Sequence, residues 1–504
     1  MIKLLFILIA FSANSWAENI RITVWHTNDV HGWIMPREAT FNQADPKRMV
    51  GGAAVLAKVL EKDKGHRLLL DAGDWFQGTP EGTLTKGKSS VEVYNAMGYD
   101  ALVPGNHEFD YGVDNLKSLV KGLKAPVLGC NAFDAKTGKR VDFLKPYVIK
   151  EVAGVKIGIF GILTTNMPRL VLPRHIQGLE FRREVDEAKK AVEALKKEGA
   201  TVIIALSHVG FETPDRPPFE GDQTIAASVP GIDLIVGGHS HTFLREALRD
   251  ATHGTLIVQA GANMSIVGRT QLEVDGKTKK VIKSEDKLMD LWVDEFSVDP
   301  KIAGVVAKYS DEVGKTLDVA VATAATAIPH ARTMDESPMG DWMTDCARDW
   351  TKTQISFQNP GGIRAGIAQG PVTLRNIFSV MPFENTLVSM TMTGSQVRDV
   401  LERGAWGKGF MQVSGMKVVY DPSKPKGERL VSAFVGDEPM GPQGSYSVST
   451  VDFLAEGGDG YDVFKAVEKK DYTYKLLRDV LEWCARKQGT MTAPVPGRIG
   501  VKGG

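Results

Sequence analysis

Five short apolar runs in the first half of the chain each end in a turn that carries Asp, His or Asn. Together with their turns they read RITVWHTNDVHG, RLLLDAGDWFQG, ALVPGNHEFD, TVIIALSHVG and IDLIVGGHSH. Short runs rich in Val, Ile and Leu are typical of buried strands, and the amphipathic stretches between them indicate an α/β arrangement. In an open α/β sheet the ends of successive strands gather along one edge, which is where ligands bind. The sequence therefore predicts that polar side chains from the five turns meet at one place.

The polar residues of these turns suit a pair of divalent cations. Taken singly, an Asp after a strand often caps a helix, and a His there is often a solvated loop residue. This explanation does not predict that five strand ends in one chain all carry such residues. Oxygen and imidazole ligands without thiolate suit zinc, manganese, iron or cobalt. Two such cations that share a carboxylate can polarise a phosphoryl oxygen and activate water. The pattern thus predicts phosphoester hydrolysis.

The turns hold five of the ten histidines of the chain. The remaining five follow no such pattern and are expected to be structural or surface groups; they are His26, His66, His175, His253 and His330.

The order of the motifs NDVHG, AGDWFQG, GNHEFD, LSHVG and GGHSH resembles the calcineurin-like metallophosphoesterase family. The resemblance implies two divalent metal ions, with zinc or manganese expected, that share one bridging carboxylate. The implied ligands are Asp29, His31, Asp74 and His241 for one metal and Asp74, Asn106, His208 and His239 for the other. The resemblance also implies that His107 lies outside the metals, where it stabilises the transition state or protonates the leaving oxygen, oriented by Asp110.

In the second half, NPGGIRAG, MPFENTL, MQVSGMKVVYD and FLAEGGDGYDVF resemble the substrate-binding domain of 5′-nucleotidases. A guanidinium binds phosphate through forked, charge-assisted bonds, and Arg364 lies in a Gly-rich turn that leaves room for a ligand. By the resemblance, Phe383 and Phe453 sandwich the base. The resemblance also implies that Asp459 accepts from the ribose hydroxyls and that Asn359 contacts the nucleoside. Without the flanking motifs, core packing would be the expected role of two lone Phe residues.

Two positions depart from the family pattern. Pro360 in NPGGIR stands where relatives commonly have Gly, which stiffens the turn beside Asn359. A second phosphate-binding arginine is expected before the segment ESPMGD. Arg332 is the only candidate there and lies one residue off the usual spacing.

The predicted fold class is α/β, or α+β overall. The resemblance implies an N-terminal metallophosphoesterase β-sandwich flanked by helices, a linker helix and a C-terminal α/β substrate-binding domain. The stretch REVDEAKKAVEALKKEG predicts an amphipathic helix with Val185, Ala188, Val192 and Leu195 on its apolar face. The expected divisions of the chain are 1–17 for a signal peptide, 18–293 for the dimetal domain, 294–317 for the linker helix and 318–504 for the nucleotide-binding domain.

The N-terminus has the features of an export signal. Lys3 precedes an apolar core, and Ser15-Trp16-Ala17 fits the small-x-small rule for cleavage, so a periplasmic or secreted location is expected. The alternative is an uncleaved anchor, but the apolar run is short of the ~20 residues that cross a bilayer. No later segment is expected to span a membrane. The three cysteines, Cys130, Cys346 and Cys484, are far apart and odd in number, and we expect them to be small core residues rather than disulfide partners or metal ligands.

Charge excludes some partners. Lys plus Arg total 61 and Asp plus Glu total 61, so no net field attracts a nucleic acid polymer or an anionic membrane. The predicted protein is an exported two-metal 5′-nucleotidase acting on small nucleotides, with nucleotide sugars and cyclic nucleotides as further substrates to test. The alternatives are a broad phosphodiesterase or sulfur-oxidation thiohydrolase and, outside enzymes, a nucleotide-binding or adhesion protein without catalysis.

Overall fold

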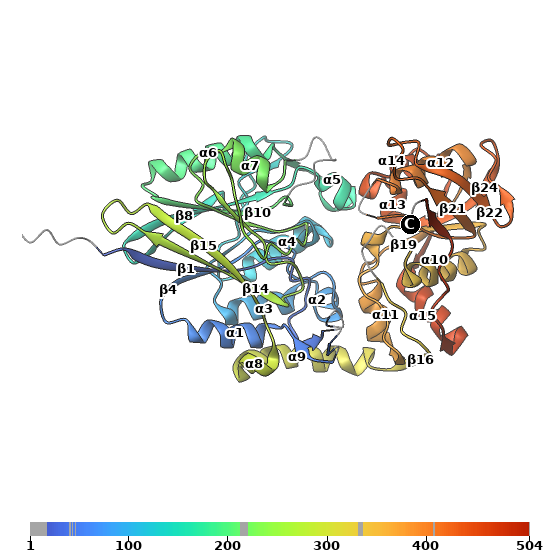
Figure 1. Cartoon of the computed structure of the whole chain (residues 1–504), viewed down its shortest axis with the longest axis horizontal. Helices are drawn as coiled ribbons and strands as arrows, with labels where there is room; N and C mark the ends of the chain where they lie inside the picture. The colour runs from blue at the N-terminus through green and yellow to red at the C-terminus, as the bar shows by residue number, and fades with distance from the viewer. Residues whose placement is uncertain are drawn as a thin grey trace, which may run out of the picture.

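The computed structural model describes residues 18–39, 42, 44, 45, 47–211, 220–330, 336–406 and 409–502. The chain forms two lobes, an N-terminal lobe in blue to yellow-green and a C-terminal lobe in orange to red (Figure 1). The expected signal peptide and Arg332 lie outside the described residues. No helix in the described part of the chain is long and apolar enough to cross a membrane.

The N-terminal lobe is built on two sheets with strand orders β15-β14-β1-β4-β5 and β12-β13-β11-β10-β8-β7. Each sheet contains a set of neighbouring parallel strands. Those of the first sheet are β1 (Ile20–Thr27), β4 (His66–Asp71) and β5 (Ala101–Leu102). Those of the second are β8 (Val155–Leu163), β10 (Val202–His208), β11 (Leu234–Gly237) and β13 (Leu256–Val258). The antiparallel strands are β7 (Tyr147–Val152), β12 (Leu248–Arg249), β14 (Ile266–Val274) and β15 (Val281–Asp290).

The five motif-bearing strands therefore belong to two sheets rather than to one open sheet. β1, β4 and β5 lie in the first, whereas β10 and β11 lie in the second. The sheets pack on a shared core of aliphatic and aromatic side chains, so the turns that follow these strands still converge.

Helices cover the outer faces of the sandwich (Figure 1). α1 (Ala53–Lys62), α3 (Lys88–Met97) and α4 (Gly112–Gly122) lie on the side of the first sheet, and α6 (Glu184–Lys197) and α7 (Asp222–Ser228) cover the second. α6 is the helix predicted from its apolar spacing. Val185, Ala188, Val192 and Leu195 are all buried against the second sheet, which confirms that prediction.

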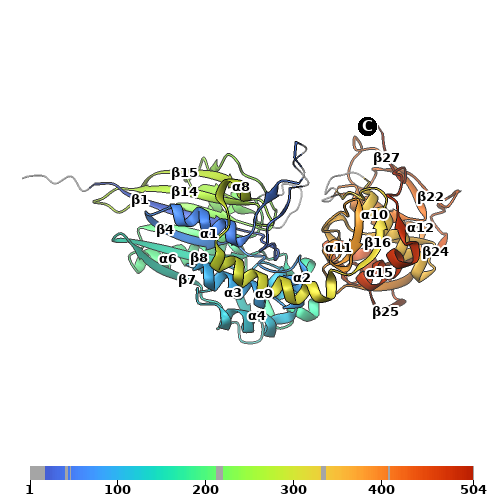
Figure 2. The same cartoon turned by 90° about the horizontal axis from the view of Figure 1, so that it is seen from below.

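A long helix, α9 (Pro300–Leu317), runs from one lobe to the other along one edge of the molecule (Figures 1 and 2). The side chain of Asp299 caps its first turn by accepting from the backbone N–H of Ile302, and Pro300 suits the first helical position. A short helix, α8 (Val293–Phe296), precedes it. α9 packs on α1, α2 (Pro80–Leu84) and α3 of the first lobe and reaches α11 (Leu374–Val380) of the second.

The C-terminal lobe has a central sheet of order β20-β17-β24-β19-β25. Its strands are β17 (Ile355–Gln358), β19 (Thr386–Thr393), β20 (Gln412–Ser414), β24 (Ser445–Val451) and β25 (Lys470–Leu476). The helices packed on it include α10 (Pro338–Thr351), α12 (Gly394–Gly404), α13 (Asp452–Ala455) and α15 (Leu477–Gln488). The smaller sheets combine β16 (Ala320–Ala324), β18 (Gly370–Thr373) and β26 (Thr490–Met491), and β21 (Met416–Tyr420), β22 (Leu430–Val435), β23 (Glu438–Pro439) and β27 (Ile499–Val501).

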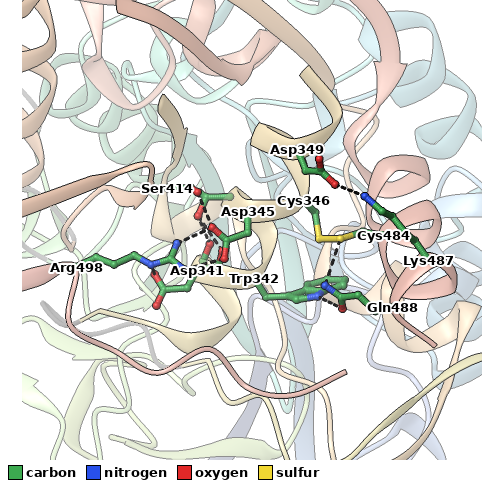
Figure 3. Close-up of a disulfide and its surroundings, with 12 residues drawn as sticks. Asp341, Trp342, Asp345, Cys346, Asp349, Ser414, Cys484, Lys487, Gln488 and Arg498 are labelled. Atoms are coloured by element: carbon green, nitrogen blue, oxygen red, sulfur yellow. Dashed lines mark hydrogen bonds and ion pairs between the residues drawn. A yellow bond between two sulfur atoms is a disulfide. The ribbon is translucent and has the colours of Figure 1, made fainter. Parts of the chain in front are cut away.

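Cys346 and Cys484 form a disulfide, so the expectation that they are unpaired core residues is wrong (Figure 3). Their Cα atoms are 5.7 Å apart although 138 residues separate them in the chain. The pairing depends on the packing of α10 against α15, which sequence spacing does not reveal. Cys130 is a free, buried thiol, as expected.

We expect removal of this disulfide to destabilise the protein. The double variant Cys346→Ser/Cys484→Ser should lose about 2–5 kcal/mol of the free energy of unfolding, because the cross-link restricts the unfolded chain over a long loop. Denaturant unfolding of the oxidised protein, the reduced protein and the double variant measures this loss. Reduction should move the wild-type midpoint to that of the variant. A midpoint that does not respond to reductant would contradict the prediction.

Candidate dimetal and nucleotide site

A cleft of about 1340 Å³ lies between the lobes and is lined by both. It exceeds the ~300–1,000 Å³ usual for small-molecule sites. Most of the described site residues predicted from the sequence line it: His31, Asp74, Asn106, His107, Asp110, His239, His241, Asn359, Arg364, Phe383, Phe453 and Asp459. The other two, Asp29 and His208, are buried behind its wall.

The first group of potential metal ligands has its ligand atoms within 4.8 Å of one another and consists of Asp29, His31, Asp74 and His241. His31 Nε2 is 2.9 Å from His241 Nε2 and 3.8 Å from Asp74 Oδ2. His241 Nε2 is 3.3 Å from Asp29 Oδ1. Two carboxylates and two imidazoles directed at one point form a donor set that suits a divalent transition metal.

The second group shares Asp74 and adds His208 and His239, again with ligand atoms within 4.8 Å. His208 Nε2 lies 3.3 Å from Asp74 Oδ2, and Asn106 Oδ1 is 3.0 Å from His239 Nδ1. The amide of Asn106 therefore adds an oxygen to this group. The geometry places Asp74 between the two groups, as a bridging carboxylate requires.

Backbone carbonyls orient two of these imidazoles. His31 Nδ1 donates to the carbonyl of Gln77 at 2.8 Å, and His208 Nδ1 donates to the carbonyl of Ala72 at 2.6 Å. A carbonyl only accepts, so each ring carries a proton on Nδ1 and directs Nε2 into the cluster. His208 Nε2 is buried and faces Asp74 Oδ2 at 3.3 Å. This arrangement is what a metal ligand needs.

Burial and neighbouring charges shift the pKa values of the cluster residues. Burial alone would raise the pKa of Asp74, but His208 and His107 outweigh it and hold that pKa well below its usual range. Burial would lower the pKa of His208, yet the neighbouring Asp74 raises it to about 10. Burial, followed by the guanidinium of Arg364, lowers the pKa of His31 well below its usual value. The cluster thus keeps an ionised carboxylate at its centre.

The turns hold several of these residues in left-handed backbone conformations. The φ angles are 49° for Asp29, 52° for His31, 60° for Asp74, 73° for His239 and 55° for His241. Asp and His adopt this region more readily than most residues, but it still costs of order 1–3 kcal/mol at each position. The surrounding hydrogen bonds must therefore enforce it.

Glu108, which no motif argument singled out, supplies some of those bonds. Its carboxylate is buried and accepts from the backbone N–H groups of Asp74, Trp75 and Gly105 at 2.6–2.9 Å. It therefore ties the turn of Asp74 to the turn that carries Asn106. Burial, followed by the charge of Asp74, raises the pKa of Glu108 to about 8. The sequence signal available for this role was the Glu of GNHEFD, which follows directly after two proposed site residues.

His107 and Asp110 lie at the opening of the cluster. His107 Nδ1 is 2.7 Å from Asp110 Oδ2, and the backbone N–H of His107 donates to Asp74. Burial would lower the pKa of His107, but Asp110 and Asp74 raise it. An imidazole that is held by a carboxylate and favours its charged form can donate a proton.

The C-terminal lobe brings its own residues to the same cleft. The guanidinium of Arg364 lies 3.2 Å from His31 Nε2 and 5.5 Å from the ring of Phe383. The Phe383 ring in turn stacks on His107, with centroids 5.6 Å apart. Asn359 donates to Asp459 at 2.6 Å, and Phe453 borders the same part of the cleft.

Several cleft residues were not predicted. His175 and His330 line the cleft, although their sequence context led us to expect structural or surface groups. Arg403 donates to the backbone carbonyls of Asp459 and Gly460 and lies over the ring of Trp406. No local motif marks these residues, because contacts between distant segments make them neighbours of the site.

Two family models match the chain. Residues 22–243 match the model described as calcineurin-like phosphoesterase, and residues 313–466 match the model described as 5′-nucleotidase, C-terminal domain. A snake venom 5′-nucleotidase from Naja atra is 31% identical over 538 residues, which cover 95% of this chain and 98% of that protein. The 5′-nucleotidase of Bos taurus is 31% identical over 98% of this chain and 93% of its own.

Solved structures share the architecture. A 5′-nucleotidase precursor from Thermus thermophilus is similar with a TM-score of 0.87 at 29% identity, covering 96% of this chain and 100% of that one. A sulfate thiohydrolase from the same organism has a TM-score of 0.81 at 18% identity, covering 96% and 97%. The similarity to the thiohydrolase, at 18% identity, indicates a shared fold alone.

Proposed function

Because this chain belongs to the 5′-nucleotidase family and is a metal-dependent phosphoester hydrolase, we propose that it removes the phosphate of nucleoside 5′-monophosphates in the cleft between its lobes. One observation carries the proposal. The cluster around Asp74 on one lobe faces Arg364 and Phe383 of the other lobe across that cleft. Residues suited to hydrolysis and residues suited to nucleotide recognition therefore share a single cavity.

The donor atoms of the cluster fit two divalent cations, with zinc or manganese expected. The proposed ligands are Asp29, His31, Asp74 and His241 at one position and Asp74, Asn106, His208 and His239 at the other. When bound, such a pair neutralises phosphoryl charge and supplies an activated nucleophile. The protein holds the ligands in place through the carbonyls of Gln77 and Ala72 and through the carboxylate of Glu108.

We assign the leaving-group proton to His107. Its Nδ1 is engaged by Asp110, so Nε2 is the nitrogen left to face the substrate. The raised pKa of His107 keeps it able to donate to the departing 5′ oxygen of the nucleoside. Phe383, stacked on the ring, limits the access of water to it.

The C-terminal lobe supplies the proposed recognition. Arg364 reaches the cluster closely enough to contact a phosphate held there, and a guanidinium offers that anion a planar fork of donors. Phe383 and Phe453 provide aromatic surfaces for the base. Asp459, which accepts from Asn359 and Arg403, is the proposed acceptor for the ribose hydroxyls. Arg332 remains the candidate for a second phosphate contact.

We also propose export to the periplasm or outside the cell. The signal-like N-terminus predicts it, and the Cys346–Cys484 disulfide provides separate support. Disulfides persist in oxidising compartments and are rare in the cytosol.

The decisive experiment is release of inorganic phosphate from AMP by the purified protein, before and after chelation and with metal restored. Separation of the products formed from ATP, a nucleotide sugar and a cyclic nucleotide tests the wider substrates for which the large cleft leaves room. Cleavage of the phosphodiesters alone, with no phosphate released from AMP, or cleavage of none of these compounds would reject the proposal.

Replacing Phe453 by Ala should separate nucleotide recognition from hydrolysis. We expect kcat/KM for AMP to fall by a factor that corresponds to about 1–3 kcal/mol of lost transition-state binding, the range for stacking of a base on an aromatic side chain. Hydrolysis of p-nitrophenyl phosphate should change much less, because that ester has no nucleoside. Phe383→Ala should show the same selectivity with an added loss on both substrates, since this ring also contacts His107. Equal losses on both substrates in Phe453→Ala would assign that residue to core packing.

A further inference from the structure

The backbone of Gln77 is fixed to the metal cluster. Its carbonyl accepts from His31 Nδ1 at 2.8 Å. The residues just before Gln77 are bonded to the loop that carries His31. The N–H of His31 donates to the carbonyl of Asp74 at 2.8 Å, and the N–H of Gly32 donates to the carbonyl of Trp75 at 3.0 Å. Gln77 is 1% exposed. Its main chain therefore keeps a constant position relative to the proposed metal ligands.

The side chain of the same residue crosses to the other lobe. Gln77 Nε2 donates to the backbone carbonyl of Pro382 at 3.2 Å. Its Oε1 accepts from the hydroxyl of Thr83 at 3.2 Å. Pro382 immediately precedes Phe383, the ring that stacks on His107.

The loop that bears Phe383 is held from its own lobe by Arg478. This side chain on α15 approaches the carbonyls of Met381, Pro382 and Phe383 at 3.3–3.4 Å, and its cation lies over the ring of Phe378 at 4.0 Å. Burial lowers the pKa of Arg478. The loop is therefore a defined unit within the C-terminal lobe, and the Gln77 side chain hydrogen-bonds this unit to the metal loop.

We propose that Gln77 is a positioning residue that sets the distance between the metal cluster and the base-binding loop for nucleotide substrates. The inference rests on the proposed function. A nucleoside monophosphate must place its base and its phosphate at the same time, so the two lobes must lie at the right distance from each other. A small aryl phosphate needs only the cluster.

Besides the stacking of Phe383 on His107 and the approach of Arg364 to His31, ion pairs between the lobes join other parts. Arg375 of α11 binds Glu81 of α2 and Asp318 at the end of α9. Arg169 of α5 (Met167–Leu170) lies 3.5 Å from Asp462 of α14 (Asp462–Lys465). These ion pairs hold the lobes together without touching the loop of Phe383. The amide of Gln77 joins two structures that both touch the substrate.

The test compares Gln77→Met and Gln77→Glu with wild type. Both variants keep the backbone carbonyl that orients His31. Met cannot donate to the Pro382 carbonyl, and Glu cannot donate when it is ionised, so Gln77→Met is the primary test. We expect kcat/KM for AMP to fall roughly 5- to 20-fold, the effect of one buried carbonyl left without its donor. The loss should be mainly in KM. Metal content should stay at the wild-type level, and p-nitrophenyl phosphate hydrolysis should change by less than about threefold.

Thr83→Val is the matched control. It removes the other partner of the Gln77 amide from an equally buried position and leaves the bond to Pro382 available. The ratio of kcat/KM for AMP to that for p-nitrophenyl phosphate should stay within about twofold of wild type. A loss equal to that of Gln77→Met would show that the packing around α2 is responsible, and would overturn the inference.

A double-mutant cycle tests the route of the effect. If Gln77 acts by placing Phe383, Gln77→Met should cost little for AMP in a Phe383→Ala background, so the two losses should not add. Full additivity would overturn the proposal, as would an unchanged substrate ratio in both Gln77 variants. Failure of the wild-type protein to hydrolyse AMP would instead reject the proposed function. The two failures are therefore distinguishable.

Discussion

Asp74→Asn should abolish turnover and weaken both metal sites. Its carboxylate lies between the two groups of potential ligands, 3.8 Å from His31 Nε2 and 3.3 Å from His208 Nε2. An amide keeps the shape but loses the negative charge that two cations would share. Because metal assistance is worth several kcal/mol, kcat/KM for AMP should fall by about 10³-fold or more.

Metal analysis of the purified variant, together with its turnover, measures the effect. Asp71→Asn is the matched control, since Asp71 is a buried carboxyl three residues away that contacts Thr27, Tyr94 and the N–H of Gly73. Burial raises the pKa of Asp71 to about 7, so a neutral amide is a mild change there. This control should keep both metals. Full metal content and activity in Asp74→Asn would refute the ligand assignment.

His107→Ala should keep the metals and lose about 10²–10⁴-fold in kcat for AMP, the usual contribution of one general acid. The size of the loss should depend on the leaving group. An alkoxide from AMP needs a proton, whereas p-nitrophenolate leaves without one. A proton donor at this position therefore predicts a much larger loss for AMP than for p-nitrophenyl phosphate.

Equal losses on the two substrates would instead assign His107 to stabilising charge on the phosphoryl group. Asp110→Asn should move activity in the same direction by a smaller factor, because it removes only the carboxylate that orients the ring. His175→Ala, a change to another histidine of the cleft, is the control and should have little effect. Unaltered activity of His107→Ala on both substrates would remove this residue from the mechanism.

Local patterns predicted much of the N-terminal lobe. Each motif combines a buried strand with the turn that follows it, so residue type and chain position together bring the polar groups to one place. The assignment of strands to sheets could not be predicted in this way. A short apolar run marks a strand, but it does not say whether β10 pairs with β4 or with β8.

Contacts between distant segments account for what was missed. The disulfide joins two helices 138 residues apart, and the role of Glu108 depends on backbone N–H groups of a different turn. Gln77 carries no charge and no metal-ligand atom in its side chain, so nothing local distinguished it from other residues of the motif. The predicted site residues came from motifs, and the residues that hold them in place became visible only in the folded chain.

The left-handed turns of the cluster bear on attempts to make this protein more heat-resistant. Five proposed ligands occupy conformations that glycine adopts without strain, so these positions would rank high in a search for substitutions that relieve backbone strain. Such substitutions would stabilise the fold while removing proposed metal ligands. A thermostable version must gain its stability elsewhere, for example on the solvent faces of α6 and α9. Laboratory selection for heat resistance therefore has to include an activity screen, or it will favour inactive proteins.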